Sequence, residues 1–99
     1  MEINTMMNGN ERVVSIKGRL DTLTSPELQP ILIDAVKSGK RTVLDCDGLE
    51  YISSAGLRVL LMAEKSAKAA NSGLIIRNVS AEIREIFEMT GFSGILTIE

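Results

Sequence analysis

The feature that most constrains the fold is an alternation of helix-like and strand-like segments after the first quarter of the chain. Apolar residues recur at helical spacing in residues 25–38, 55–70 and 81–90, and short apolar strand patterns lie between them at 41–46 and 74–77. Strands separated by helices pair in parallel through right-handed crossovers. The alternation therefore predicts an α/β fold built on a partly parallel sheet.

The N-terminal segment departs from this alternation, because only a turn sequence separates its two strand-like stretches. Residues 1–7 and 12–17 flank Asn8-Gly9-Asn10, residue types that tolerate the left-handed backbone of a tight turn. A β-hairpin is expected here, and the apolar residues 95–98 are expected to add a short last strand. The sequence thus predicts one domain over residues 1–99, with a small mixed sheet of four to five strands packed against helices.

Capping and turn residues predict where these elements begin and end. The Thr24-Ser25 pair is expected to supply a cap for the first helix and Ser80 to cap the third, because a hydroxyl there accepts a hydrogen bond from a free amide. The Asp47-Gly48 pair predicts a turn after the central strand. Glycines are expected to end the three helices: Gly39, Gly73 and Gly91.

The composition argues against two function classes. The 99 residues carry a net charge of −2 and only three aromatic side chains, with no run of lysine and arginine, so a nucleic acid partner is not expected. The chain has no histidine, which is the commonest general base and a frequent zinc ligand. We therefore expect no enzyme activity, no catalytic residues, and neither a metal nor another cofactor.

Hydropathy and cysteine content give expectations about location. No apolar stretch approaches the roughly 20 residues that a membrane-spanning helix needs, so direct membrane insertion is not expected. The single cysteine, Cys46, lies in an apolar strand pattern and is expected to be a buried, inert thiol. This usage of cysteine fits a reducing, cytoplasmic environment.

A junction of two serines and a glycine, Tyr51-Ile52-Ser53-Ser54-Ala55-Gly56-Leu57, lies between the central strand and the second helix. A hydroxyl before a helix accepts a hydrogen bond from a free amide of the first turn, and the partial positive charge there favours an anion. The serines are therefore helix caps, with Ser53 the better cap, or one of them carries a regulatory phosphate. The two interpretations are compatible, since a capping hydroxyl stays exposed.

Three other positions near the ends of the predicted elements carry open alternatives. Gly56 costs about 1 kcal/mol relative to alanine inside a helix, so either a packed strand or a bound partner is expected close to it. Asp21 follows a strand, where an acid commonly caps a turn. On the second helix Ala63, Ala67 and Ala70 are expected to form a buried alanine stripe, and Arg58 and Met62 point away from it and are candidates for a contact patch.

Four stretches of the chain together resemble a known family. These stretches are Gly18-Arg19-Leu20-Asp21, Val43-Leu44-Asp45, the serine junction through Leu61, and residues 86–92. Over nearly its whole length the chain resembles a STAS domain of the stand-alone bacterial anti-sigma factor antagonist type. The resemblance implies the STAS fold and a partner-switching function. In that family an anti-sigma factor that is also a serine protein kinase phosphorylates the antagonist, and a serine phosphatase removes the phosphate. The unmodified antagonist captures the anti-sigma factor.

The resemblance also implies roles for particular residues. The family's modified serine follows an aspartate and lies two residues before the junction glycine, which corresponds to Ser54, with Ser53 as the second candidate. Ser53 replaces the family's aspartate. The resemblance places Asp21 near the serine and against the partner. The partner-binding set is expected to be Asp21, Ser53, Gly56, Arg58 and Met62. The alternative is a constitutive STAS subunit of a lipid ABC transporter or of a signalling scaffold.

Overall fold

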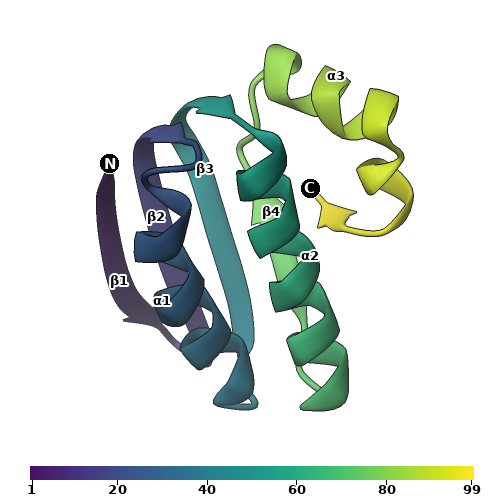
Figure 1. Cartoon of the computed structure of the whole chain (residues 1–99). Helices are drawn as coiled ribbons and strands as arrows, with labels where there is room; N and C mark the ends of the chain where they lie inside the picture. Colours follow the sequence, from purple (N-terminus) through teal and green to yellow (C-terminus); the bar gives the residue numbers. More distant parts are fainter.

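The computed structural model describes residues 1 to 99 and shows a five-stranded sheet in the order β1-β2-β3-β4-β5 (Figure 1). The strands are β1 (Glu2–Asn8), β2 (Glu11–Leu20), β3 (Arg41–Ile52), β4 (Leu74–Arg77) and β5 (Thr97–Ile98). β1 pairs antiparallel with β2, and every other neighbouring pair is parallel. The predicted mixed α/β sheet is therefore confirmed.

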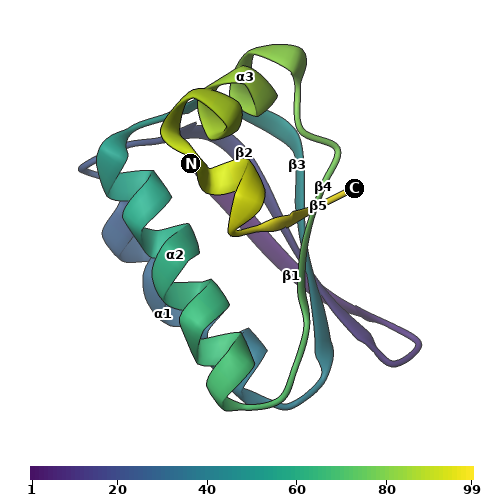
Figure 2. The ribbon, with the colours of Figure 1, turned by 90° about the vertical axis from the view of Figure 1, so that its right-hand side faces the viewer.

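Three helices and one short 3₁₀ turn connect these strands. They are α1 (Ser25–Lys37), α2 (Ser54–Ala69), α3 (Ala81–Thr90) and η1 (Phe92–Gly94). α1 and α2 lie side by side on one face of the sheet (Figure 2). α3 lies beyond the ends of β3 and β4, at the top of Figure 1. No helix is long and apolar enough to cross a bilayer.

The core fills the space between the sheet and the two parallel helices. Inward-facing strand residues such as Leu44 and Ile76 pack there, and Phe87 of α3 is the largest fully buried side chain. The predicted alanine stripe is confirmed for Ala63 and Ala67, which are buried and allow α2 to approach the sheet closely, whereas Ala70 is only partly buried and lies at the C-cap. Cys46 is also buried, and desolvation, with a smaller contribution from Asp45, raises its pKa to about 12.

The predicted hairpin is confirmed. Asn8 and Glu11 form the last pair of the β1–β2 ladder, so Gly9 and Asn10 make the loop. Gly9 has φ +65°, a left-handed conformation that a glycine adopts without the steric cost of a side chain.

The predicted turn at Asp47-Gly48 is wrong, because β3 continues through these residues to Ile52. Ser15 pairs with Asp45 and Lys17 with Gly48, so β3 inserts one extra residue and forms a bulge. A Cβ at Gly48 would lie 2.9 Å from the Lys17 Cγ. The close approach of Lys17 across the bulge requires glycine at position 48. The Asp47-Gly48 dipeptide is also a common turn signal.

Two predicted helix ends also need correction. Thr24 occupies the N-cap of α1 without a side-chain cap bond, because its Oγ1 accepts from the Asp21 amide at 2.9 Å instead and donates to the Arg19 carbonyl at 2.7 Å. α2 ends at Ala69 and turns through Asn71, with φ +54°, rather than through Gly73. The Ser72 amide then donates to the Ala67 carbonyl at 2.8 Å, which is the closing bond of a Schellman turn.

The remaining helix ends are those that the sequence predicts. Ser80 caps α3, and its hydroxyl accepts a hydrogen bond from the Ile83 amide at 3.2 Å. Gly39 and Gly91 have φ +81° and +82°, and each follows the last turn of its helix.

Candidate functional site

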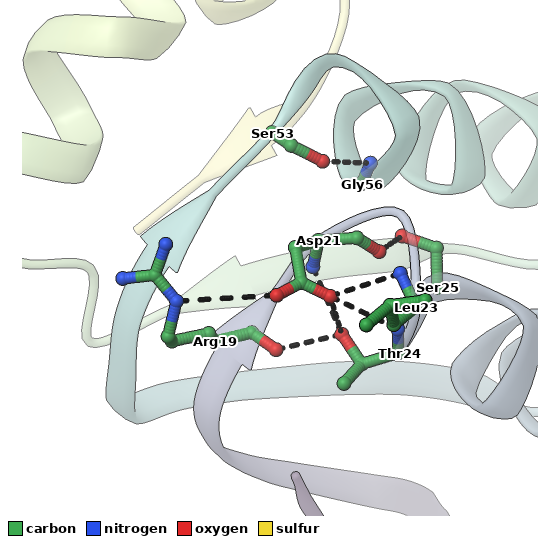
Figure 3. A network of polar contacts seen from close by, with 7 residues as sticks. All are labelled: Arg19, Asp21, Leu23, Thr24, Ser25, Ser53 and Gly56. Atoms are coloured by element: carbon green, nitrogen blue, oxygen red, sulfur yellow. Dashed lines mark hydrogen bonds and ion pairs between the residues drawn. The ribbon is translucent and has the colours of Figure 1, made fainter.

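The candidate site lies where the parallel strands β2 and β3 end at the same edge of the sheet. The loop from β2 to α1 and the junction from β3 to α2 leave this edge next to each other (Figure 3). The Ser53 amide donates to the Leu20 carbonyl at 2.9 Å and ties the two connections together. Parallel pairing thus brings residues 19–24 beside the serine junction, as the resemblance implied for Asp21.

Ser53 caps α2, as predicted. Its backbone is extended, and its Oγ accepts a hydrogen bond from the Gly56 amide at 3.3 Å (Figure 3). Its carbonyl accepts the first helical bond, from Leu57, at 2.9 Å. Because Ser53 performs the capping, the neighbouring Ser54 hydroxyl is not required for it.

Ser54 is the first residue of α2 and is exposed. Its hydroxyl takes part in none of the side-chain hydrogen bonds within the chain, in contrast to that of Ser53. The two serines therefore differ in their local roles, since one is engaged by the backbone and the other faces solvent.

Gly56 is buried in the first turn of α2. A Cβ at this position would lie 2.8 Å from both the Ile52 Cγ1 and the Leu20 Cγ, closer than real Cβ contacts. The packing interpretation of Gly56 is thereby supported, because two strand residues lie where a side chain would go. Contact between Gly56 and a partner stays a prediction.

Asp21 organises the loop between β2 and α1. Its Oδ1 accepts hydrogen bonds from the Thr24 and Leu23 amides, both at 3.0 Å, and at 3.1 Å it shares the Thr24 hydroxyl proton with the Arg19 carbonyl (Figure 3). These bonds, led by that of the Thr24 amide, lower the Asp21 pKa against a smaller opposing effect of desolvation. The turn-capping role considered for Asp21 is confirmed, and the loop presents Leu23 with 85% of its surface exposed.

Arg19 and Tyr51 form a contact that the residue pattern does not predict. The Arg19 guanidinium carbon lies 4.1 Å from the centre of the Tyr51 ring, and its Nε lies 3.9 Å from the Asp21 Oδ2. Arg19 on β2 pairs with Tyr51 on β3, directly after a second register shift in this ladder, between Gly18 and Arg19. Only the observed register could have revealed this pair.

Arg58 and Met62 lie together on α2, beside the loop. Both line a recess of about 240 Å³ between α1 and α2, with Thr22 and Pro26 on the opposite wall. Arg58 is exposed, and Met62 is an exposed large hydrophobic side chain. The recess therefore adjoins the serine junction and offers an apolar side chain next to a cation.

The fold is that of solved anti-sigma factor antagonists. A crystal structure of an anti-sigma factor antagonist from Mycobacterium paratuberculosis superposes with a TM-score of 0.83 at 22% identity, covering 98% of this chain and 83% of that one. The unphosphorylated form of the anti-sigma factor antagonist SpoIIAA superposes with a TM-score of 0.76 at 18% identity, covering 99% and 87%. At these identities the likeness establishes the fold.

The sequence places the chain in a family. The family model described as "Mlab, STAS domain" matches residues 3–97, and the chain belongs to the STAS domain family. BtrV of Bordetella bronchiseptica is 33% identical over 87 residues, which cover 87% of this chain and 75% of that protein. The anti-sigma-B factor antagonist of Listeria monocytogenes is 31% identical over 87 residues, with 87% and 76% covered.

Proposed function

We propose that this chain is an anti-sigma factor antagonist whose affinity for its partner depends on Ser54. In this proposal the unmodified chain binds an anti-sigma factor that is also a serine protein kinase. Phosphorylation of Ser54 releases that partner, and a serine phosphatase restores binding. Relatives named anti-sigma factor antagonists support the class of function.

The observation that carries the proposal is the division of roles between the two serines. Ser53 holds the cap bond to Gly56, so Ser54 can be modified without removing that bond. A phosphate adds about −1.5 to −2 charges and three acceptor oxygens at neutral pH. The positive end of α2 tolerates this charge, whereas a partner surface packed on a neutral hydroxyl does not. We therefore expect a small change in fold and a large change in affinity.

The partner surface is proposed to include Asp21, Ser53, Gly56, Arg58 and Met62 around Ser54. The exposed Leu23 extends it, because Asp21 holds the loop that presents this side chain. Asp21 and Gly56 act there through shape, the first by fixing the loop and the second by allowing the first turn of α2 to approach β2 closely. The chain itself is proposed to act without catalysis, in the cytoplasm where sigma factors work.

Paired baits test the switch. Ser54→Ala and Ser54→Asp variants are used to capture proteins from a lysate of the native organism, and the bound proteins are identified by mass spectrometry. Capture of a serine kinase of the anti-sigma type by the alanine bait, with loss on the aspartate bait, supports the proposal. Ser66→Asp adds the same charge elsewhere on α2 and is expected to leave capture unchanged.

The same experiment separates the alternative function. A constitutive subunit of a lipid ABC transporter or of a signalling scaffold would bind the same proteins in both states of Ser54. Identical capture by the alanine and aspartate baits would therefore overturn the switch.

The serine at position 53, where the family has an aspartate, is tested separately. If the family's aspartate orients the modified serine, Ser53→Asp should speed phosphorylation of Ser54 by the purified kinase. An unchanged rate would remove that role for the side chain at position 53.

A further inference from the structure

Arg58 lies one helical turn after Ser54 on the surface of α2. Residues four apart on a helix are surface neighbours, with about 5 to 6 Å between their Cβ atoms. Long side chains on a helix lean toward its N-terminus, so the Arg58 side chain can reach the turn that holds Ser54. Both residues are exposed. A negative group added to Ser54 would therefore lie within reach of the Arg58 guanidinium.

Arg58 has no anionic partner in the unmodified chain. It takes part in none of the ion pairs, whereas Arg19 at the same edge is engaged by Asp21 and by the ring of Tyr51. The first turn of α2 contains no acidic residue. The recess that Arg58 lines between α1 and α2 has no carboxylate in its wall.

Asp21 does not compete for Arg58. Its Oδ1 accepts three hydrogen bonds within the loop, and its Oδ2 faces Arg19. The lowered Asp21 pKa reflects these same bonds, led by that of the Thr24 amide. Asp21 is therefore paired with Arg19, and Arg58 is left without a charged partner.

We propose that Arg58 is the built-in counter-ion of a phosphate on Ser54. The inference rests on the proposed function, because it takes Ser54 as the modified residue. The guanidinium N–H groups would donate to the phosphate oxygens, and arginine suits this role because its planar fork can donate two bonds at once. Modification would then change the partner surface twice, by adding a phosphate and by drawing Arg58 out of the recess beside Met62.

A titration of the phosphate tests the pair without any kinase. Phosphoserine is incorporated at position 54 during translation, by suppression of a stop codon, and its second pKa, ordinarily about 6, is followed by ³¹P NMR. A nearby guanidinium favours the dianion and lowers this pKa. Arg58→Gln is expected to raise it by roughly 0.2 to 0.4 unit, and Arg58→Lys by less.

Matched variants make the result specific. Lys65→Gln removes one positive charge from the same helix at about 16 Å along its axis from Ser54 and is expected to shift the phosphate pKa by less than about 0.1 unit. Phosphorylation should also shift the ¹⁵N resonance of the Arg58 Nε. Equal phosphate shifts for Arg58→Gln and Lys65→Gln would overturn the pair, as would a shift produced by Arg19→Gln alone.

The pair and the switch can fail separately. If no partner responds to Ser54, the capture experiment fails while the titration still detects the pair. If the phosphate pKa does not change when Arg58 is replaced, the pair is wrong, and the capture result can still support the switch.

Discussion

The ring of Tyr51 on β3 lies beneath the guanidinium of Arg19 on β2, with 4.1 Å between the guanidinium carbon and the ring centre. The same guanidinium is 3.9 Å from Asp21, whose carboxylate holds the loop to α1. One cation thus bridges the end of β3 and the loop that follows β2. The contact lies at the sheet edge from which the serine junction leaves.

This contact should have a measurable coupling energy. We predict that Arg19→Gln and Tyr51→Leu each destabilise the protein modestly, and that a double-mutant cycle gives a coupling of about 0.5 to 1 kcal/mol in favour of the pair. Urea unfolding followed by circular dichroism measures the three free energy differences. Strictly additive effects would show that the stacked geometry contributes nothing to stability.

Gly56→Ala should destabilise the protein although alanine is the better helix former. The added methyl would lie 2.8 Å from Ile52 and Leu20, and such overpacking costs about 1 to 3 kcal/mol, against a gain of about 1 kcal/mol in helix propensity. We expect a net loss on the order of 1 kcal/mol in the free energy of unfolding. Gly73→Ala is the matched control, since a Cβ there meets no atom within 4 Å. A Gly56→Ala variant as stable as this control would contradict the packing argument.

The two adjacent serines should respond differently to the same substitution. Ser53→Ala removes the oxygen that accepts the Gly56 amide bond and should cost about 1 kcal/mol, which lowers the melting temperature by roughly 4 to 8 °C in a domain of this size. Ser54→Ala removes no bond within the chain and should change stability by less than about 0.5 kcal/mol. Thermal unfolding compares the two, and a reversed order would reassign the cap to Ser54.

Glu64 on α2 is a buried carboxyl whose Oε1 has no hydrogen-bond partner. Desolvation raises its pKa above the ordinary 4.5, and Lys68, with its Nζ 3.9 Å from the Oε2, only partly opposes this. The folded state therefore holds the Glu64 proton more tightly than the unfolded state does. The extra stability that the folded state gains from binding this proton is fully present below the ordinary pKa of 4.5 and is lost as the pH rises through the raised pKa.

We predict that Glu64→Gln raises stability near pH 7 by on the order of 1 kcal/mol, because the amide carries no buried charge. The advantage should shrink as the pH falls through the raised pKa toward the ordinary 4.5, below which the wild-type carboxyl is protonated in the folded and the unfolded state alike. Chemical unfolding at several pH values measures both effects, with the exposed Glu50→Gln as the control. A gain that stays constant across this range would rule out the carboxyl charge as its source.

The sequence predicted the elements that depend on local patterns. The hairpin loop at Gly9, the helix cap at Ser53 and the parallel order of the later strands all follow from residue types and periodicity. The bulge at Gly48 did not, since Asp-Gly is a signal for a turn and for a bulge alike. A contact between strands, such as Arg19 with Tyr51, depends on the register, which this bulge shifts.

Tertiary packing explains the other differences. Glu64 lies next to the alanine stripe of α2, and only the packed structure shows that its carboxyl is buried as well. Asn71 ends α2 because asparagine also tolerates the left-handed conformation that Gly73 was expected to supply. The roles of the site residues toward a partner depend on a second molecule, so neither the sequence nor the fold of this chain determines them.

The tie between the two loops has a consequence for how the site can evolve. Ser53 bonds to Leu20 through its backbone amide, so every residue type except proline can keep this link. Its side chain needs only an oxygen that can accept the Gly56 amide, and aspartate, asparagine, serine and threonine all provide one. Aspartate, asparagine, serine and threonine can therefore exchange at position 53 with both the helix cap and the tie to Leu20 kept, so the architecture of this edge does not dictate which of the four stands there.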